Sequence, residues 1–132
     1  KAEATKTEGK AWFLTDGYLT LAERLYRDGS QRMIGWNFGP GEENAQTVQW
    51  IVQRVCEQWG PGAQWSKDAE QHPHEAGYLK LDSSMARTHL GWRPKLDLET
   101  ALRWTVEWYR AYRQESDMRA VTLEHIKRFM AA

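Results

Sequence analysis

The segment Thr47-Val-Gln-Trp-Ile-Val-Gln-Arg-Val-Cys-Glu-Gln-Trp59 repeats its apolar residues with a helical period. The repeating positions are Val48, Ile51, Val52, Val55 and Trp59. Thr47 can cap the start of a helix, and Gly60-Pro61 can end it. The pattern therefore predicts an amphipathic helix over residues 48–59, with Cys56 on its apolar side as a buried small hydrophobe.

Upstream of this helix the pattern changes to that of a strand. Residues 32–38, Arg-Met-Ile-Gly-Trp-Asn-Phe, are short, apolar and aromatic, and turn-forming Gly, Pro, Asp and Ser residues bound them on both sides. This predicts a buried strand, and residues 78–81 predict a second short strand. Before the first strand, apolar residues at helical spacing predict a helix that Asp16 caps and Gly29 stops.

Three helical segments are expected downstream. Asp82 caps a short helix over residues 85–90, a longer helix runs from Asp97 to Tyr112, and a last helix runs through residues 121–130. The order of elements predicts a small, helix-rich α/β fold with two or three short strands. A sheet of that size usually packs against further structure.

Composition limits the classes of function. The chain has 132 residues, with 18 Lys and Arg against 18 Asp and Glu. This balance argues against a general nucleic-acid or membrane-surface binder. A single cysteine excludes an internal disulfide and a cysteine-cluster zinc site, and it favours the reducing cytoplasm. We also expect no membrane span and no signal peptide, since no apolar stretch is long enough.

Motifs for cofactor binding and catalysis are not found in the sequence. The glycine-rich dinucleotide fingerprint is missing, because Gly39-Pro-Gly41 and Gly60-Pro-Gly62 place proline where a phosphate-binding loop needs a backbone N–H. No tyrosine is followed four positions later by the lysine that would assist proton transfer. We therefore expect no catalytic residue and no cofactor site in this chain.

A polar stretch over residues 64–76 predicts a long loop that contains His72-Pro-His-Glu75. In an extended backbone His72 and His74 project to the same side, so that with Asp68 or Glu75 they could hold a metal ion. A second hypothesis is that these side chains bind loop backbone and an anionic or sugar ligand, which suits a proline-held polar loop better. The third is a purely structural loop.

Aromatic residues are numerous, with 8 Trp and 5 Tyr. Trp104, Trp108, Tyr109 and Tyr112 recur at helical spacing and could form a stacking platform for bases or sugars. Stripes of this kind are more often part of the core, and we favour that interpretation.

Several strings of the sequence resemble one family. They are Gly17-Tyr-Leu-Thr-Leu-Ala-Glu-Arg-Leu-Tyr26, Trp36-Asn-Phe-Gly-Pro40, His72-Pro-His-Glu-Ala76, Leu79-Lys-Leu-Asp-Ser83, Leu90-Gly-Trp-Arg-Pro94, Trp104-Thr-Val-Glu-Trp-Tyr109 and Asp117-Met-Arg119. Together they resemble the C-terminal part of the CDP-glucose 4,6-dehydratases, which are extended short-chain dehydrogenase/reductases. Leu-Gly-Trp-x-Pro is common to many nucleotide-sugar epimerases and dehydratases, whereas the combination with His-Pro-His-Glu-Ala indicates the CDP-glucose branch.

The resemblance implies a domain organisation. Residues 17–132 would form a single C-terminal lobe on the substrate side, and residues 1–16 a divergent N-terminal segment. Most of the Rossmann domain, which holds NAD and the Tyr/Lys pair in the family, would be missing. We therefore expect a chain that is not catalytic by itself and that carries no cofactor of its own.

The resemblance also implies a substrate-binding set. Its members are His72, His74, Glu75, Lys80 and Arg87. The two histidines would donate to phosphate or sugar oxygens, the glutamate would accept from a hydroxyl, and the lysine and arginine would add charge at the diphosphate end. A nucleotide sugar should bind weakly, because one wall of the cleft would be missing.

The alternative function is a stand-alone scaffold or interaction module derived from the same lobe, without catalysis. Helices that evolved to pack on a second domain would leave apolar surface exposed, and self-association commonly covers such surface. A homo-oligomer, most simply a two-fold dimer, is therefore expected. Neither hypothesis involves nucleic acid or a membrane.

Overall fold

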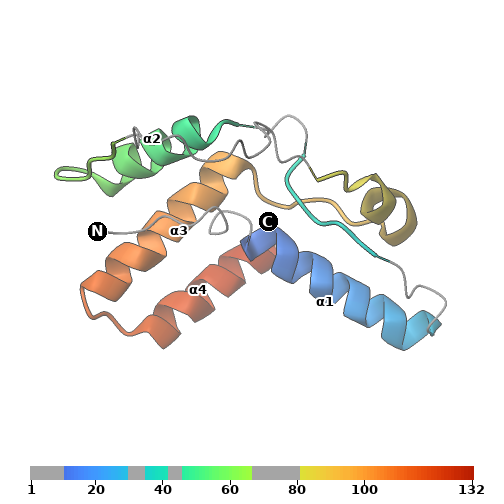
Figure 1. The fold of residues 1–132 in the computed structure, drawn as a ribbon. Helices are drawn as coiled ribbons and strands as arrows, with labels where there is room; N and C mark the ends of the chain where they lie inside the picture. The colour runs from blue at the N-terminus through green and yellow to red at the C-terminus, as the bar shows by residue number, and fades with distance from the viewer. Residues whose placement is uncertain (1–10, 30–34, 42–45, 67–80) are drawn as a thin grey trace.

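The computed structural model describes residues 11–29, 35–41, 46–66 and 81–132, with side chains from residue 14 onward. Its elements are α1 (Ala11–Asp28), α2 (Val48–Trp59), the π-helical turn η4 (Ala86–Leu90), α3 (Leu98–Arg113) and α4 (Met118–Ala131). α3 and α4 form an antiparallel pair, α2 packs against α3, and α1 packs against η4 (Figure 1). None of the helices in the described ranges is long and apolar enough to cross a bilayer.

The predicted α/β class is wrong, because the described residues form helices and no strand. Of the predicted strand at 32–38, residues 35–38 are described, and they have no regular secondary structure. The side chain of Asn37 donates to the carbonyl of Asp82 at 3.4 Å, but a sheet requires repeated bonds between two backbones. Of the second predicted strand, 78–81, only Leu81 lies within the described residues.

α1 begins earlier than the sequence pattern predicts. It starts at Ala11, so Asp16 lies inside the helix and is not its N-cap. The carboxylate of Asp16 instead accepts a hydrogen bond from the indole Nε1 of Trp92 at 2.7 Å. The predicted end is confirmed, because Gly29 has a φ of 78° and its N–H donates to the carbonyl of Leu25.

The starts of α2 and α3 agree with the predicted caps. Thr47 accepts from the N–H of Trp50 at 3.2 Å, and Asp97 accepts from the N–H of Thr100 at 2.7 Å. Each cap gives a partner to a backbone N–H that has none within its helix. The bond from the Thr100 N–H also holds the pKa of the Asp97 carboxyl below its ordinary value.

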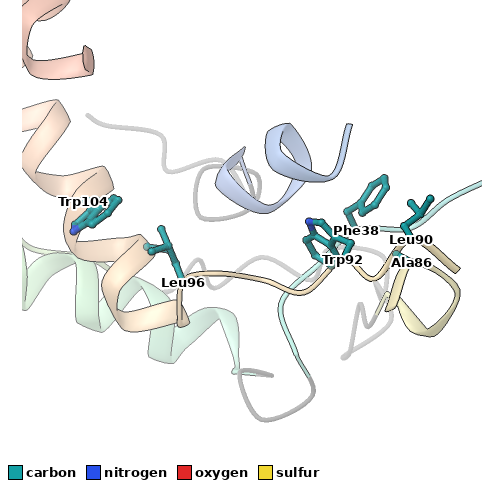
Figure 2. Close-up of a cluster of buried hydrophobic side chains, with 7 residues drawn as sticks. Phe38, Ala86, Leu90, Trp92, Leu96 and Trp104 are labelled. Atoms are coloured by element: carbon teal, nitrogen blue, oxygen red, sulfur yellow. The ribbon is translucent and has the colours of Figure 1, made fainter. Parts of the chain in front are cut away.

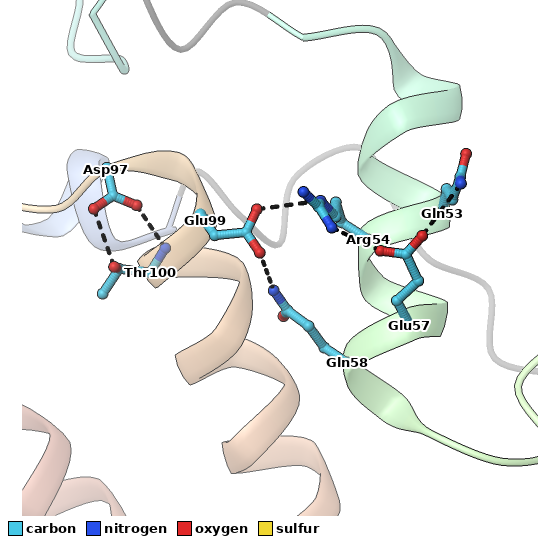
Figure 3. A network of polar contacts seen from close by, with 7 residues as sticks. All are labelled: Gln53, Arg54, Glu57, Gln58, Asp97, Glu99 and Thr100. Atoms are coloured by element: carbon cyan, nitrogen blue, oxygen red, sulfur yellow. Dashed lines mark hydrogen bonds and ion pairs between the residues drawn. The ribbon is translucent and has the colours of Figure 1, made fainter.

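α2 is attached to α3 through polar contacts (Figure 3). The Nε of Arg54 lies 3.4 Å from Glu99 Oε2, and Gln58 Nε2 donates to Glu99 Oε1 at 2.9 Å. Arg54 also pairs with Glu57 at 2.8 Å within α2. None of the α2 residues is buried, so the prediction that Cys56 is buried is wrong: its side chain is half-buried.

The buried core extends from η4 to α3 (Figure 2). Its members are Phe38, Ala86, Leu90, Trp92, Leu96, Ala101 and Trp104. The ring of Phe38 is 1% exposed and packs edge-to-face on Trp92, with 5.1 Å between the ring centroids. This contact joins residues 35–41 to the segment that follows η4.

Phe38 also fixes the position of α1. A Cβ added at Gly17 would overlap the Cγ and Cδ1 atoms of the Phe38 ring, so position 17 admits no side chain unless this ring moves. The neighbouring Tyr18 meets the same ring edge-to-face at 5.8 Å. The close approach brings α1 against residues 35–41.

Candidate functional site

Arg87 is the member of the predicted substrate-binding set that the structure describes. His72, His74, Glu75 and Lys80 lie outside the described residues, and their roles stay predictions. The hypothesis of a metal site at the two histidines falls on the same segment. Within the residues that the structure does describe, no group of three or more His, Cys, Asp or Glu side chains could hold a metal ion.

The side chain and backbone of Arg87 are held by the residues that precede η4. Its Nη2 donates to Ser84 Oγ at 2.9 Å, and its backbone N–H donates to the carbonyl of Ser83 at 3.1 Å. The N–H of Ser84 in turn donates to Asp82 Oδ1 at 2.8 Å. A guanidinium has five N–H donors, and the bond to Ser84 uses one of them. The half-buried Arg87 is therefore oriented while it keeps donors that suit a phosphate.

The turn that carries Arg87 is η4. It ends at Gly91, as the sequence predicts, with a φ of 66°. The N–H groups of Gly91 and Trp92 both donate to the carbonyl of Ala86. This turn has π-helical bonding where an α-helix was expected, and π-helical turns frequently occur at functional sites.

Trp92 ties η4 to α1. Its ring is 3% exposed, and its indole N–H reaches Asp16 across a separation of 76 residues. A hydrogen bond to a carboxylate is stronger than one between neutral groups, and the 2.7 Å distance fits this type. No sequence pattern indicates this pair, because an aspartate at position 16 also matches the pattern of a helix cap.

The aromatic stripe of α3 divides between core and surface. Trp104 is 5% exposed and belongs to the core, which confirms the favoured interpretation for that residue. For the tyrosines it is wrong, since Tyr109 and Tyr112 are 38% and 59% exposed. Trp108 stacks on Tyr112 with 5.8 Å between the ring centroids and donates through Nε1 to Thr122 at 3.0 Å.

The turn Gly60-Pro-Gly62 does not fit a dinucleotide-binding loop. Such a loop leads into a helix, whose free N–H groups hold the pyrophosphate. The turn Gly60-Pro-Gly62 instead follows α2, and the N–H of Gly60 is used to donate to the carbonyl of Cys56.

A second polar cluster joins α3 to α4. His125 is 4% exposed, and its Nε2 lies 3.7 Å from Glu107 Oε2, which also accepts from Arg128 Nη1 at 3.0 Å. The guanidinium of Arg128 covers the ring of Trp104 at 4.4 Å. Burial lowers the pKa of His125 and the Arg128 cation lowers it further, while Glu107 and Glu124 oppose the shift.

This cluster predicts a loss of stability in mild acid. Because the pKa of His125 is lower in the folded than in the unfolded chain, the unfolded chain binds more protons below about pH 6.5. The stabilisation is complete above the unfolded pKa and is lost as the pH falls through the folded one. Thermal unfolding at about pH 7.5 and about pH 5.5 measures this change.

The fall in melting temperature on acidification should be smaller for His125→Gln than for the unsubstituted chain. His89→Gln is the control, since the side chain of His89 is exposed. An equal fall for the chain and the His125 variant would contradict the prediction.

Comparison with known proteins relates the chain to two curated sequences, although no family model matches it. It is 44% identical over 116 residues to CDP-glucose 4,6-dehydratase of Salmonella typhimurium, covering 88% of this chain and 32% of that protein. It is 26% identical over 106 residues to a probable dTDP-glucose 4,6-dehydratase of Sinorhizobium fredii, covering 74% and 29%. The chain thus spans about a third of the length of these relatives.

These similarities relate the chain to one class of proteins, the glucose 4,6-dehydratases. Within that class it is similar to CDP-glucose 4,6-dehydratase, and the match is consistent with the C-terminal part of that protein. The resemblance predicted from the sequence motifs is confirmed.

Proposed function

We propose that the chain supplies nucleotide-sugar-binding residues of a CDP-glucose 4,6-dehydratase and is not catalytic by itself. The observation that carries this proposal is the 44% identity to such an enzyme over 88% of the chain. The geometry of Arg87 supports it, because a guanidinium that Ser84 orients and that has further N–H donors suits a diphosphate.

In this proposal each part of the site has a separate task. Arg87 and Lys80 neutralise the diphosphate, His72 and His74 donate to phosphate or sugar oxygens, and Glu75 accepts from a sugar hydroxyl. The lobe binds and orients the nucleotide sugar. NAD and the proton-transferring residues belong to another part of such a dehydratase, which acts in the cytoplasm.

Titration of CDP-glucose into the ¹⁵N-labelled chain tests the proposal. We expect chemical-shift changes at residues 68–87 and a millimolar dissociation constant, which corresponds to about 4 kcal/mol. Binding should be weak because a ligand that is largely solvated gains little from each charged contact after the costs of desolvation and ordering. Arg87→Ala should weaken binding severalfold, whereas Arg110→Ala, at the exposed end of α3, should not.

Two results would contradict parts of this proposal. Unchanged spectra at millimolar CDP-glucose would exclude nucleotide-sugar binding by the chain. Formation of a 4-keto-6-deoxy sugar from CDP-glucose and NAD by the purified chain would show that it is catalytic.

A second candidate function is that of an oligomeric scaffold, which the surface of α1 favours. Tyr18, Leu19 and Tyr26 are 58%, 66% and 92% exposed, and apolar surface of this kind is commonly covered by association. We expect a two-fold dimer in sedimentation velocity at low micromolar concentration, and Leu19→Glu should weaken it. A chain that sediments only as a monomer would contradict this function.

A further inference from the structure

Consecutive residues of α1 contact two segments that are distant in the sequence, residues 35–41 and the segment that follows η4. Asp16 accepts the indole hydrogen bond of Trp92 at 2.7 Å, and Gly17 lies directly against the ring of Phe38. Phe38 and Trp92 also contact each other edge-to-face. One turn of α1 therefore contacts both Phe38 and Trp92, which come before and after the proposed site in the sequence.

The contact at Trp92 is transmitted to Arg87 through the backbone of η4. The N–H of Trp92 donates to the carbonyl of Ala86 at 3.2 Å, and Ala86 is completely buried. Arg87 is the next residue, and its guanidinium donates a hydrogen bond to Ser84, just before η4. A displacement of the Trp92 ring thus changes the position of the turn from which Arg87 projects.

The contact at Phe38 is linked to the residues that precede η4. A Cβ added at its neighbour Gly39 would lie 3.5 Å from the Cβ of Leu81, and its neighbour Asn37 donates to the carbonyl of Asp82. The turn of α1 that contacts Trp92 is thus also connected, through Phe38, to the chain just before η4.

The hydrogen bond between Asp16 and Trp92 is more than a packing detail. A buried indole N–H that loses its partner costs about 1–3 kcal/mol, so the ring moves if that allows the N–H to find another acceptor. The bond to a carboxylate is stronger than one to a neutral acceptor, so it favours the ring orientation in which the N–H faces Asp16. Asp16 thus contributes, together with the packing of Phe38, to the position of Trp92.

We propose that Asp16 is a positioning residue for nucleotide-sugar binding, which acts through Trp92 to orient the guanidinium of Arg87. The identity of the ligand rests on the proposed function, whereas the effect on Arg87 exists in the free chain. The two statements can therefore be tested separately.

Spectra of the free chain test the orientation of Arg87. Asp16→Ala should shift the Nε–H signals of both Trp92 and Arg87, and Asp16→Asn, which keeps an oxygen acceptor, should shift them less. Asp28→Ala, at the end of the same helix, is the control. Trp92→Phe keeps a ring but removes the donor, so it should shift the Arg87 signal as Asp16→Ala does. It replaces Asp16→Ala in the test if Asp16→Ala does not fold. An unchanged Arg87 signal in both variants would overturn the inference.

Binding measurements test the consequence for the ligand. Asp16→Ala should weaken CDP-glucose binding about threefold, and the double variant with Arg87→Ala should bind no more weakly than Arg87→Ala alone. Effects that multiply would overturn the inference, since Asp16 would then act independently of Arg87. If the unsubstituted chain does not bind CDP-glucose, the proposed function fails, and the spectra of the free chain decide the positioning role.

Discussion

Replacing Gly17 by alanine should destabilise the chain by about 2 kcal/mol. The new Cβ would overlap the ring of Phe38, which is 1% exposed and also contacts Trp92 edge-to-face. An overlap this close belongs at the upper end of the range for overpacking, about 3 kcal/mol, and the gain of about 1 kcal/mol from replacing a helical glycine leaves a net loss of about 2 kcal/mol. Urea unfolding monitored by circular dichroism measures the change.

Gly35→Ala is the matched control for Gly17→Ala, because a Cβ at Gly35 meets nothing within 4 Å. Equal stability of Gly17→Ala and Gly35→Ala would contradict the close contact between α1 and Phe38. The pair with Phe38→Ala adds a stricter test. Removal of the ring makes room for the methyl group, so the double variant should lose less stability than the sum of the single losses.

The second large effect is expected for Trp104→Ala, at about 3–5 kcal/mol. Trp104 is 5% exposed, and it packs on the core, on His125 and beneath the guanidinium of Arg128. Its removal leaves a cavity between α3 and α4, and the cavity cost adds to the lost transfer free energy. Thermal and urea unfolding measure the loss.

Trp65→Ala, at a tryptophan that is 41% exposed, is the control and should cost much less. If Trp104→Ala does not fold, Trp104→Phe should show the same direction of change at a smaller magnitude. Equal stability of the Trp104 and Trp65 variants would contradict the position of Trp104 in the core.

Local signals account for the parts of the fold that could be predicted. Caps such as Thr47 and Asp97 and the stop at Gly29 depend on a few neighbouring residues, so their types can be read from sequence. The strand at 32–38 was predicted from an apolar run, but such a run does not reveal whether a partner strand exists. Phe38 is buried because it packs on Gly17 and Trp92, which are distant in sequence.

The candidate site shows the same division. The set that includes Arg87 follows from a family resemblance, and the similarity to CDP-glucose 4,6-dehydratase confirms that resemblance. The pairing of Asp16 with Trp92 joins residues 76 positions apart, and no local pattern indicates such a contact. Its sequence signal was ambiguous, because an aspartate near the start of an apolar helical stretch is also typical of an N-cap.

The way in which α2 is attached to α3 determines how easily this helix unfolds locally. This helix has no buried residue, and its contacts with α3 include the Arg54–Glu99 ion pair and the bond from Gln58, which lie where salt and water can compete. Local opening of a sparsely packed helix requires much less free energy than global unfolding. Amide hydrogens of α2 should therefore exchange with solvent faster than those of α3. The helices α3 and α4 should stay paired while α2 detaches from them at a lower free-energy cost.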